Sequence, residues 1–245
     1  MRGFIFRNLY ICKNFQIVAI ILNIETATKN CSVSIANNGA VLVLKELNDL
    51  NYSHAEKLHP FINAALKEAK ITIHQIDAVA VSKGPGSYTG LRIGVSAAKG
   101  ICFAIDKPLI SIDTLTSLSN AISIHDGVVV PMLDARRMEV YAAVFSADNK
   151  AIREIKAEII YTHSFSDYLE KGNVYFLGDG AKKCQPILTH KNAVFVADKF
   201  PSAKEMATLS FEKFQQHQFE DVAYFEPFYL KDFLVVPEKK KQPTF

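Results

Sequence analysis

The sequence predicts a duplicated α/β fold, in which two related subdomains each begin with β-strands and then add helices. In the first half, a strand, a hairpin and a helix precede another strand, a glycine-rich loop and a second helix. From about residue 114 a second unit of strands and helices follows, and no short-period repeat is present. We therefore expect subdomain I over residues 17–113, completed by a C-terminal segment, and subdomain II over residues 114–231.

The composition is that of an ordinary globular protein. Of the 245 residues, 49% are hydrophobic and 22% are charged, so the chain can bury a core without disulfides or metals. It contains no run of about 18 apolar residues, and we expect no membrane-spanning helix. The four cysteines, Cys12, Cys31, Cys102 and Cys184, form no C-x-x-C pair. This pattern is typical of a reduced, cytoplasmic protein with incidental thiols.

The basic residues concentrate at the two ends of the chain. The net charge is +3, but residues 1–16 carry three bases and no acid, and four lysines lie within residues 231–245. The intervening body is therefore slightly acidic, which argues against a nucleic-acid-binding surface. We expect residues 1–16 to be a poorly ordered extension rather than a signal peptide, because the apolar run after them continues directly into a strand. Residues 232–245 are expected to be a polar tail.

The first strands are expected to form an antiparallel meander. Residues 18–24 are a continuous apolar run typical of a buried strand, and residues 31–36 alternate between apolar and polar side chains. Asn37-Asn38-Gly39 then supplies the residues that a tight hairpin turn prefers, and residues 41–47 are the next strand. The pattern predicts three neighbouring strands at the start of one sheet.

A capping box marks the start of the first helix. In Ser53-His54-Ala55-Glu56 the serine hydroxyl can accept from the third helical amide while the glutamate reaches back to the serine amide. Apolar side chains then recur at helical spacing and predict one buried face, made of Leu58, Phe61, Ile62, Ala65 and Leu66. A strand over residues 76–81 follows.

The glycine-rich loop at residues 84–90 lies between that strand and a helix expected over residues 91–105. A loop in this context can hold an anion, because the free amides at a helix start favour negative charge. However, the glycine spacing matches neither a phosphate-binding P-loop nor a dinucleotide-binding loop. The alternative is a tight turn that needs glycine backbone angles, with Ser87 or Thr89 capping the helix.

The helix after this loop carries two kinds of side chain. Its small residues would let another helix approach closely, within the chain or on a partner, and they are Gly94, Ala97, Ala98 and Gly100. Its apolar residues recur on one side at helical spacing, as Leu91, Val95, Ala98, Ile101, Cys102 and Ile105. A strand over residues 109–112 ends the first unit.

The second half is expected to contain a short helix after Thr114, strands over residues 128–133, 140–145 and 174–177, and a helix after Pro201. After the first of these strands, Asp134 and Arg136 could place a carboxylate and a guanidinium group in a cleft. A structural ion pair is the alternative that we favour. Gly178-Asp179-Gly180 marks a turn after the third strand.

Neither a metal site nor a catalytic nucleophile is predicted. His54 and His59 are five residues apart, so on a helix they point about 140° away from each other, whereas a zinc-binding pair needs an i, i+4 spacing. The other histidines have no cysteine or carboxylate at ligand spacing, and no G-x-S-x-G nucleophile motif occurs. We therefore expect no catalytic residues and no metal ligands.

Six stretches of the chain, in order, resemble the TsaB (YeaZ) family. They span about residues 18–231, and the glycine-rich stretch with its following helix is the most specific of them. The stretches are Ile21–Thr28, Ser53–Leu58, Gly84–Gly94, Asp134–Tyr141, Gly178–Ala181 and Glu226–Leu230. The resemblance implies an actin/Hsp70-like (ASKHA, ribonuclease H-like) fold with two related subdomains.

The resemblance also implies a role as a non-catalytic partner subunit in the transfer of threonylcarbamoyl to the adenosine next to the anticodon of tRNA. It implies that the chain binds and activates the TsaD subunit, which holds the metal and the transferase site, beside the TsaE ATPase. ATP and metal are thus expected on TsaD and TsaE, with no cofactor held tightly by this chain alone. We further expect a homodimer when the chain is alone, contact with tRNA only through the complex, no membrane and a cytoplasmic location.

The resemblance places the partner interface on the capping-box helix and on the helix after the glycine-rich loop. The interface residues implied in this way are Ser53, His54, Leu58, Phe61, Leu91, Gly94, Val95 and Ala98. The glycine-rich loop would fix the relative placement of the two helices through Gly84, Gly86, Ser87, Thr89, Gly90 and Arg92. The apolar faces of both helices agree with this interpretation.

The nucleotide cleft of the ASKHA fold is expected to be degenerate in this chain. The residues that would line it are Glu25, Thr26, Asp134, Arg136, Gly178 and Gly180. Actin-like ATPases follow the first strand with a glycine-containing turn, but here Ala27 stands in that turn and its Cβ hinders the approach of phosphates. The second phosphate turn also lacks glycine, and only the adenosine-side turn retains it. We therefore expect weak nucleotide binding, or none, by the chain alone.

Two other functions stay open. The first is a stand-alone ASKHA enzyme, either a kinase or a glycoprotease-like hydrolase. A kinase needs the phosphate turns, and a protease needs a nucleophile or an activated water, for which no ligand set is visible in the sequence. The second is an RNA-binding module, which the charge distribution disfavours.

Overall fold

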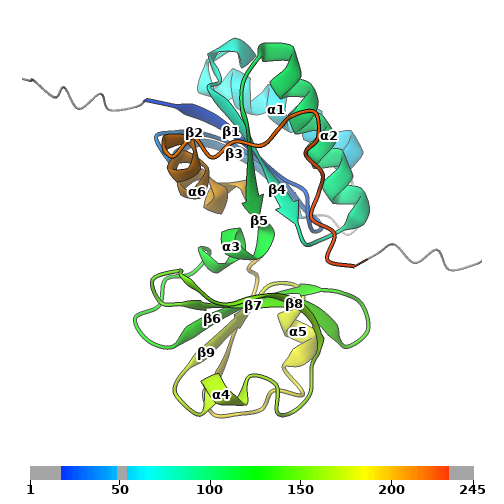
Figure 1. Cartoon of the computed structure of the whole chain (residues 1–245), viewed down its shortest axis with the longest axis vertical. Helices are drawn as coiled ribbons and strands as arrows, with labels where there is room; N and C mark the ends of the chain where they lie inside the picture. Colours follow the sequence, from blue (N-terminus) through cyan, green and yellow to red (C-terminus); the bar gives the residue numbers. More distant parts are fainter. Residues whose placement is uncertain (1–17, 49–53, 232–245) are drawn as a thin grey trace, which may run out of the picture.

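The computed structural model describes residues 18–48 and 54–231, and the predictions for residues 1–17, 49–53 and 232–245 lie outside the described residues. These include the N-terminal extension, the polar tail and Ser53 of the capping box. Figure 1 shows two lobes, each built on its own sheet, with a short helix between them. Within the described ranges no helix is both long and apolar enough to cross a membrane.

The first sheet has the strand order β3-β2-β1-β4-β5. Its strands are β1 (Ile20–Glu25), β2 (Asn30–Asn37), β3 (Ala40–Asn48), β4 (Ala78–Gly84) and β5 (Leu109–Asp113). The strands β1 to β3 are antiparallel neighbours, whereas β4 and β5 run parallel to β1. Asn38 and Gly39 join β2 to β3 with φ angles of 51° and 80°, the left-handed geometry that a tight hairpin needs. The predicted meander is confirmed.

Helices cover both faces of this sheet. The helices α1 (His54–Ala69) and α2 (Tyr88–Ile105) pack on one face, and α6 (Ala203–Gln215) packs on the other (Figure 1). A short 3-10 helix (Ile73–Gln75) follows α1. The apolar sides of α1 and α2 join the strands in the largest core cluster, while α6 closes a second one. The helix α2 begins three residues before the predicted start, because Ser87 rather than Thr89 is its N-cap.

The second sheet repeats the plan of the first, with the order β10-β9-β6-β7-β8. Its strands are β6 (Val128–Asp134), β7 (Glu139–Ser146), β8 (Ala151–Ile159), β9 (Val174–Leu177) and β10 (Ala193–Val196). Again the first three strands are antiparallel neighbours, and the last two run parallel to the first. The short helices α4 (Ser166–Leu169) and α5 (Ala181–Cys184) complete this lobe. The two matching topologies confirm the predicted duplicated α/β fold.

The predicted boundary of subdomain II is wrong at its C-terminal end. The helix α6 packs against β1, β2 and β5, so it belongs to subdomain I although it lies within residues 114–231. The chain after α6 also returns to the first sheet, where Glu220 pairs with Leu109 of β5. The short helix α3 (Thr114–Ser119) packs against both sheets and joins the lobes. Subdomain II therefore ends after β10, and the expected C-terminal completion of subdomain I includes α6.

Candidate functional site

The turn after β1 is held by a buried carboxylate. Glu25 is completely buried, and its Oε1 accepts hydrogen bonds from the amide of Ala27 at 2.6 Å and from the hydroxyl of Ser82 at 2.7 Å. Burial raises the pKa of Glu25 to about 7, although these hydrogen bonds oppose the shift. A phosphate-binding turn needs amides that are free to donate to the ligand. The Ala27 amide is instead used by the side chain of Glu25.

The glycine-rich loop lies directly on this turn. A Cβ at Gly86 would lie 2.4 Å from the carbonyl oxygen of Ala27, and a Cβ at Gly90 would lie 2.1 Å from that of Thr26. A Cβ at Gly94 would lie 2.2 Å from Oγ1 of Thr26, which donates to the carbonyl of Gly90 at 2.8 Å. These glycines are therefore required by close packing within the chain. The close approach predicted for Gly94 is made by the β1–β2 turn and not by another helix.

The remaining loop residues fix the start of α2. The hydroxyl of Ser87 accepts from the Gly90 amide at 3.3 Å, and the Ser87 amide donates to the carbonyl of Ala27 at 2.6 Å. Gly84 has a φ of 117° and lies against the backbone of Phe228. Thr89 and Arg92 are exposed on the first turns of the helix. The loop thus positions the start of α2 against the turn after β1.

Several of the predicted interface side chains face inward. Leu58, Leu91, Val95 and Ala98 are between 0% and 4% exposed and belong to the core of this chain, and Gly94 is buried as well. His54 is 1% exposed, and its Nε2 lies 2.7 Å from the carbonyl oxygen of Thr28. Phe61 is half-buried against the same core, and Ser53 lies outside the described residues. The interface prediction is wrong for the buried side chains, because a partner cannot reach them.

The opposite side of α2 is open to solvent. It consists of Thr89, Arg92, Ser96, Gly100 and Phe103, which recur at helical spacing and which we call the α2 outer face. Phe103 is 87% exposed, an unusual position for a large aromatic side chain. A Cβ at Gly100 would meet no atom within 4 Å, so this glycine is not explained by packing within the chain. The outer face therefore combines small residues with an exposed aromatic ring.

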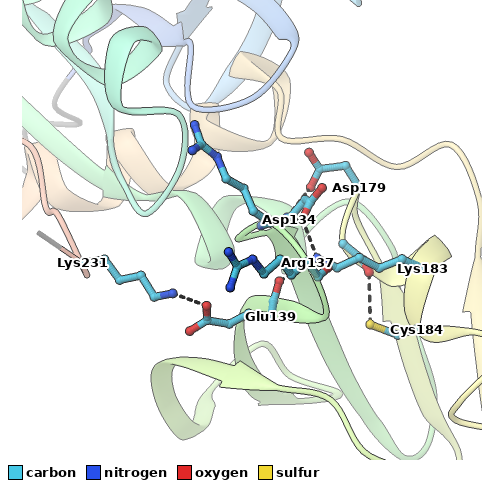
Figure 2. Close-up of polar contacts among 9 residues, drawn as sticks. Asp134, Arg137, Glu139, Asp179, Lys183, Cys184 and Lys231 are labelled. Atoms are coloured by element: carbon cyan, nitrogen blue, oxygen red, sulfur yellow. Dashed lines mark hydrogen bonds and ion pairs between the residues drawn. The ribbon is translucent and has the colours of Figure 1, made fainter. Parts of the chain in front are cut away.

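A lysine holds the turn between β6 and β7, where Asp134 and Arg136 lie. The Nζ of Lys183 on α5 lies 2.5 Å from Oδ1 of Asp134, 2.8 Å from the carbonyl oxygen of Arg137 and 2.6 Å from that of Glu139. Arg136 and Arg137 have φ angles of 70° and 51°, which are uncommon for residues with bulky side chains. Figure 2 shows the guanidinium group of Arg137 turned away from Lys183. The structural ion pair is therefore present, but its cation is Lys183 rather than Arg136.

The turn after β9, which the resemblance would place on the adenosine side of a nucleotide cleft, is also used within the chain. The Asp134 amide donates to Oδ1 of Asp179 at 3.0 Å, and burial raises the pKa of Asp179. A Cβ at Gly178 would lie 2.2 Å from the carbonyl oxygen of Met132, and one at Gly180 would lie 2.8 Å from the carbonyl carbon of Leu133. Both glycines are therefore needed for packing against β6. The predicted cleft residues thus form two groups, one around Glu25 and Thr26 and one around Asp134.

The sequence interpretation did not identify two further features. One is Lys183, whose role depends on a contact with a turn that lies about 45 residues earlier and that no local pattern predicts. The other is residues 220–231, which run along α2 and place Tyr229 against Tyr88 with ring centroids 4.9 Å apart. The stretch Glu226–Leu230 was singled out by resemblance, but nothing local in it predicts this contact.

Among the described residues, the grouping of possible metal ligands and the burial of the thiols limit metal and thiol chemistry. In residues 18–48 and 54–231 we find no group of three or more histidine, cysteine or acidic side chains placed to hold a metal ion. Cys31, Cys102 and Cys184 are free and buried, and burial raises the pKa of each thiol to about 11 or 12. Such thiols are largely protonated at neutral pH and hence poor nucleophiles.

Comparison with known proteins finds one family model and several relatives that match most of this chain. The model of the family described as "TsaD: tRNA N6-adenosine threonylcarbamoyltransferase" matches residues 49–241. The tRNA threonylcarbamoyladenosine biosynthesis protein TsaB of Escherichia coli (strain K12) is 30% identical over 224 residues, which cover 86% of this chain and 94% of that protein. The protein of the same name from Haemophilus influenzae is 29% identical over 223 residues and covers 86% and 93%.

Solved structures share the fold. YeaZ from Pseudomonas aeruginosa matches with a TM-score of 0.71 and 22% identity over 86% of this chain and 100% of that chain. A second structure from the same organism, described as similar to peptidase YEAZ, matches with a TM-score of 0.74 and 22% identity over 87% and 100%. The two-lobed architecture is therefore that of known proteins of similar length.

Proposed function

Because the chain belongs to the TsaB family of tRNA threonylcarbamoyladenosine biosynthesis proteins, we propose that it is a non-catalytic subunit that binds and activates TsaD. TsaD then transfers threonylcarbamoyl to the adenosine next to the anticodon of tRNA. ATP and metal belong to TsaD and TsaE in this proposal, and tRNA is contacted only through the complex. The chain works in the cytoplasm and pairs with a second copy of itself when no partner is present.

One observation carries the non-catalytic part of the proposal: backbone amides in both phosphate turns already have acceptors within the chain. The Ala27 amide donates to Glu25, and the Arg136 amide donates to Oδ1 of Asp134 at 2.8 Å. A nucleotide would have to displace both side chains from these amides. Titration of the isolated chain with Mg-ATP should therefore give binding no tighter than millimolar. A dissociation constant in the micromolar range would contradict this part of the proposal.

We assign the docking surface to the α2 outer face. Its exposed Phe103 supplies the kind of aromatic anchor that interfaces use, and Gly100 and Ser96 leave room for a second helix to approach closely. Arg92 adds a charge at the end of the same face. This assignment keeps the helix that the family resemblance indicated, but it replaces the buried side chains of that helix by the exposed ones.

The test is reconstitution of tRNA modification with purified TsaD, TsaE, threonylcarbamoyl-adenylate and tRNA. We expect modification to fall strongly when the chain is omitted, and Phe103→Asp to weaken association with TsaD at least ten-fold. The matched control is Ile152→Asp on β8, because Ile152 is a 51% exposed apolar side chain on the other lobe. Both variants should melt at nearly the parental temperature, since neither side chain is in the core.

The outcomes separate the candidate functions. Modification that proceeds undiminished without the chain would reject the partner role. If Phe103→Asp and Ile152→Asp weaken association with TsaD equally, the α2 outer face is rejected as the docking surface. ATP turnover or proteolysis by the chain alone would favour a stand-alone ASKHA enzyme. Salt-sensitive binding of tRNA to the isolated chain would favour an RNA-binding module.

A further inference from the structure

The C-terminal part of the described chain forms a strap across subdomain I. The strap consists of residues 220–231, and Figure 1 shows it in orange to red, running from the sheet over α2 to the level between the two lobes. Its first residue is anchored twice at β5. The Glu220 amide donates to the carbonyl of Leu109 at 2.8 Å, and the hydroxyl of Ser111 donates to the Glu220 carboxylate at 2.5 Å.

The middle of the strap is held by α2. The Nζ of Lys99 donates to the carbonyl oxygens of Ala223 at 3.1 Å and Phe225 at 2.9 Å. Val222 and Phe225 also pack against the core cluster beneath the two helices. A lysine that binds two backbone carbonyls of a segment without regular secondary structure fixes the path of that segment along the helix.

The end of the strap lies on the glycine-rich loop. The Phe228 amide donates to the carbonyl of Lys83 at 2.7 Å, and a Cβ at Gly84 would lie 2.6 Å from the carbonyl oxygen of Phe228. Beyond this point the ring of Tyr229 packs on Tyr88 at the start of α2. The strap therefore follows α2 from one end to the other and finishes next to the loop.

The last described residue of the strap reaches the other lobe. Lys231 forms an ion pair with Glu139, the first residue of β7 (Figure 2). Of the ion pairs among the described residues, this one alone joins subdomain II to a segment anchored on subdomain I. Lys231 is 41% exposed and Glu139 is 22% exposed, so the pair is accessible to solvent and can open without disturbing either core.

We propose that the strap is a latch, in which the Lys231–Glu139 ion pair holds the two subdomains in one relative orientation and its opening lets them rotate about α3. The geometry supports a hinge at α3, because α3 packs on both sheets and lies between the lobes. The strap is placed to the side of this connection and spans the two lobes beside α2. Because the ion pair lies to the side of α3 and not on it, rotation about α3 must separate its two partners.

The latch also lies next to the α2 outer face. Arg92 of that face has its guanidinium carbon 5.3 Å from the centroid of the Tyr88 ring, and Tyr88 in turn contacts Tyr229 of the strap. A partner helix seated on the outer face would touch the Tyr88–Tyr229 pair and so favour one state of the latch. This coupling to a partner rests on the function proposed above, whereas the latch itself does not.

The latch can be tested on the isolated chain with charge-reversal variants. Lys231→Glu and Glu139→Lys each place like charges at the contact, and the double variant restores an opposite pair. Lys150→Glu is the matched control, since Lys150 pairs with Asp148 entirely within subdomain II. Spin labels at Asn63→Cys on α1 and Lys171→Cys beside α4, both exposed positions, report the distance between the lobes. Cys12 is replaced by serine, because the other three native cysteines are buried.

We expect each single reversal to raise, by about two- to five-fold, the population of lobe orientations that differ from the parental one. An effect of this size is typical of an exposed ion pair. The double variant should return the distance distribution to the parental one, and Lys150→Glu should leave it unchanged. Identical distributions in all variants would reject the latch. Equal broadening in the control and in both single reversals would also reject it, because the effect would then follow from any reversed surface charge rather than from this contact.

The coupling has a separate readout. With TsaD added, the distance distribution of the parent should narrow or shift, and Tyr229→Ala should reduce that response while Tyr229→Phe, which keeps the ring, should not. If TsaD binds without changing the distribution, the coupling is wrong and the latch stands on the isolated chain. If TsaD does not bind at all, the function proposed above fails and the latch result is unaffected.

Discussion

At the scale of single residues, the helix α2 contains two glycines with opposite surroundings. Gly94 is buried against Thr26, whereas Gly100 faces open space. In the sequence both belong to one series of small residues, and nothing local distinguishes them. The difference arises because the β1–β2 turn, which is nearly 70 residues earlier than Gly94, presses on one side of the helix only.

This contrast gives a prediction for two matched substitutions. Gly94→Ala should lower the free energy of unfolding by about 1–3 kcal/mol, because the new methyl group overlaps Thr26 and forces the turn or the helix to move. Gly100→Ala should instead raise it by up to about 1 kcal/mol, since alanine is the better helix former and its Cβ meets nothing. Urea denaturation of both variants measures the two values, and equal effects would contradict the packing described for Gly94.

The candidate site residues were predictable in type but not in role. The turns that follow β1, β6 and β9 were identified from the sequence, and the structure places each at the end of its strand. The side chains that hold these turns from elsewhere could not be predicted, because Glu25 accepts from Ser82 of β4 and Asp134 is paired with Lys183 of α5. Contacts between distant segments leave no local pattern in a single sequence.

At the scale of elements, the predictions succeeded where periodicity was strong. The alternating and continuous apolar runs identified the first strands, and helical spacing identified α1 and α2. The strand β8 was missed because it is an edge strand with charged residues along Ala151–Ile159, and such charges protect an edge from pairing with other chains. The helices α4 and α5 are only four residues long, too short for a periodic signal. The strand β10 was missed although β9 is equally short, because a glycine turn marks the end of β9 and none follows β10.

The apolar face of α2 was located correctly but interpreted wrongly. An apolar stripe on a helix looks the same in the sequence whether it faces the core or a partner, and here it faces the core. Ala98→Glu should therefore unfold the chain, at a cost of about 3 kcal/mol or more, because a carboxylate would be buried without a partner. Thermal melts followed by circular dichroism measure this loss. A variant that melts like the parent would show that Ala98 is exposed, and the interface first predicted for this side of α2 would then be possible again.

At the scale of the whole molecule, the fold was predictable because both sheets obey one topological plan. Each begins with an antiparallel meander and adds two parallel strands, but the strand order of the second sheet was not predicted, because β8 and β10 were missed. The assignment of α6 to the first sheet was not predictable in the same way. The sequence predicted only a helix after Pro201, without the sheet that it covers, and the structure shows it packing against β1 and β5.

Buried acids give the whole molecule a pH dependence that can be predicted in sign. The pKa of Glu25 is about 7 in the folded chain against an ordinary value of 4.5, and burial also raises the pKa values of Glu205 and Asp179. The folded chain therefore binds more protons than the unfolded chain between about pH 4.5 and pH 7. The contribution of Glu25 to stability is fully present below pH 4.5 and is lost as the pH rises through about 7.

The expected loss from Glu25 is up to about 3 kcal/mol between pH 5 and pH 8. Glu25→Gln removes the titration and keeps Oε1 for Ala27 and Ser82, while the amide nitrogen replaces Oε2, which has no hydrogen-bond partner in the structure. Urea denaturation at several pH values should thus show a steep decline for the parent and a shallower one for the variant. Asp148→Asn is the control, because Asp148 is exposed, its pKa lies below the ordinary value and it stays ionised throughout this range. Parallel declines in the parent and in Glu25→Gln would mean that Glu25 titrates normally, and the turn after β1 would then have to be open to water.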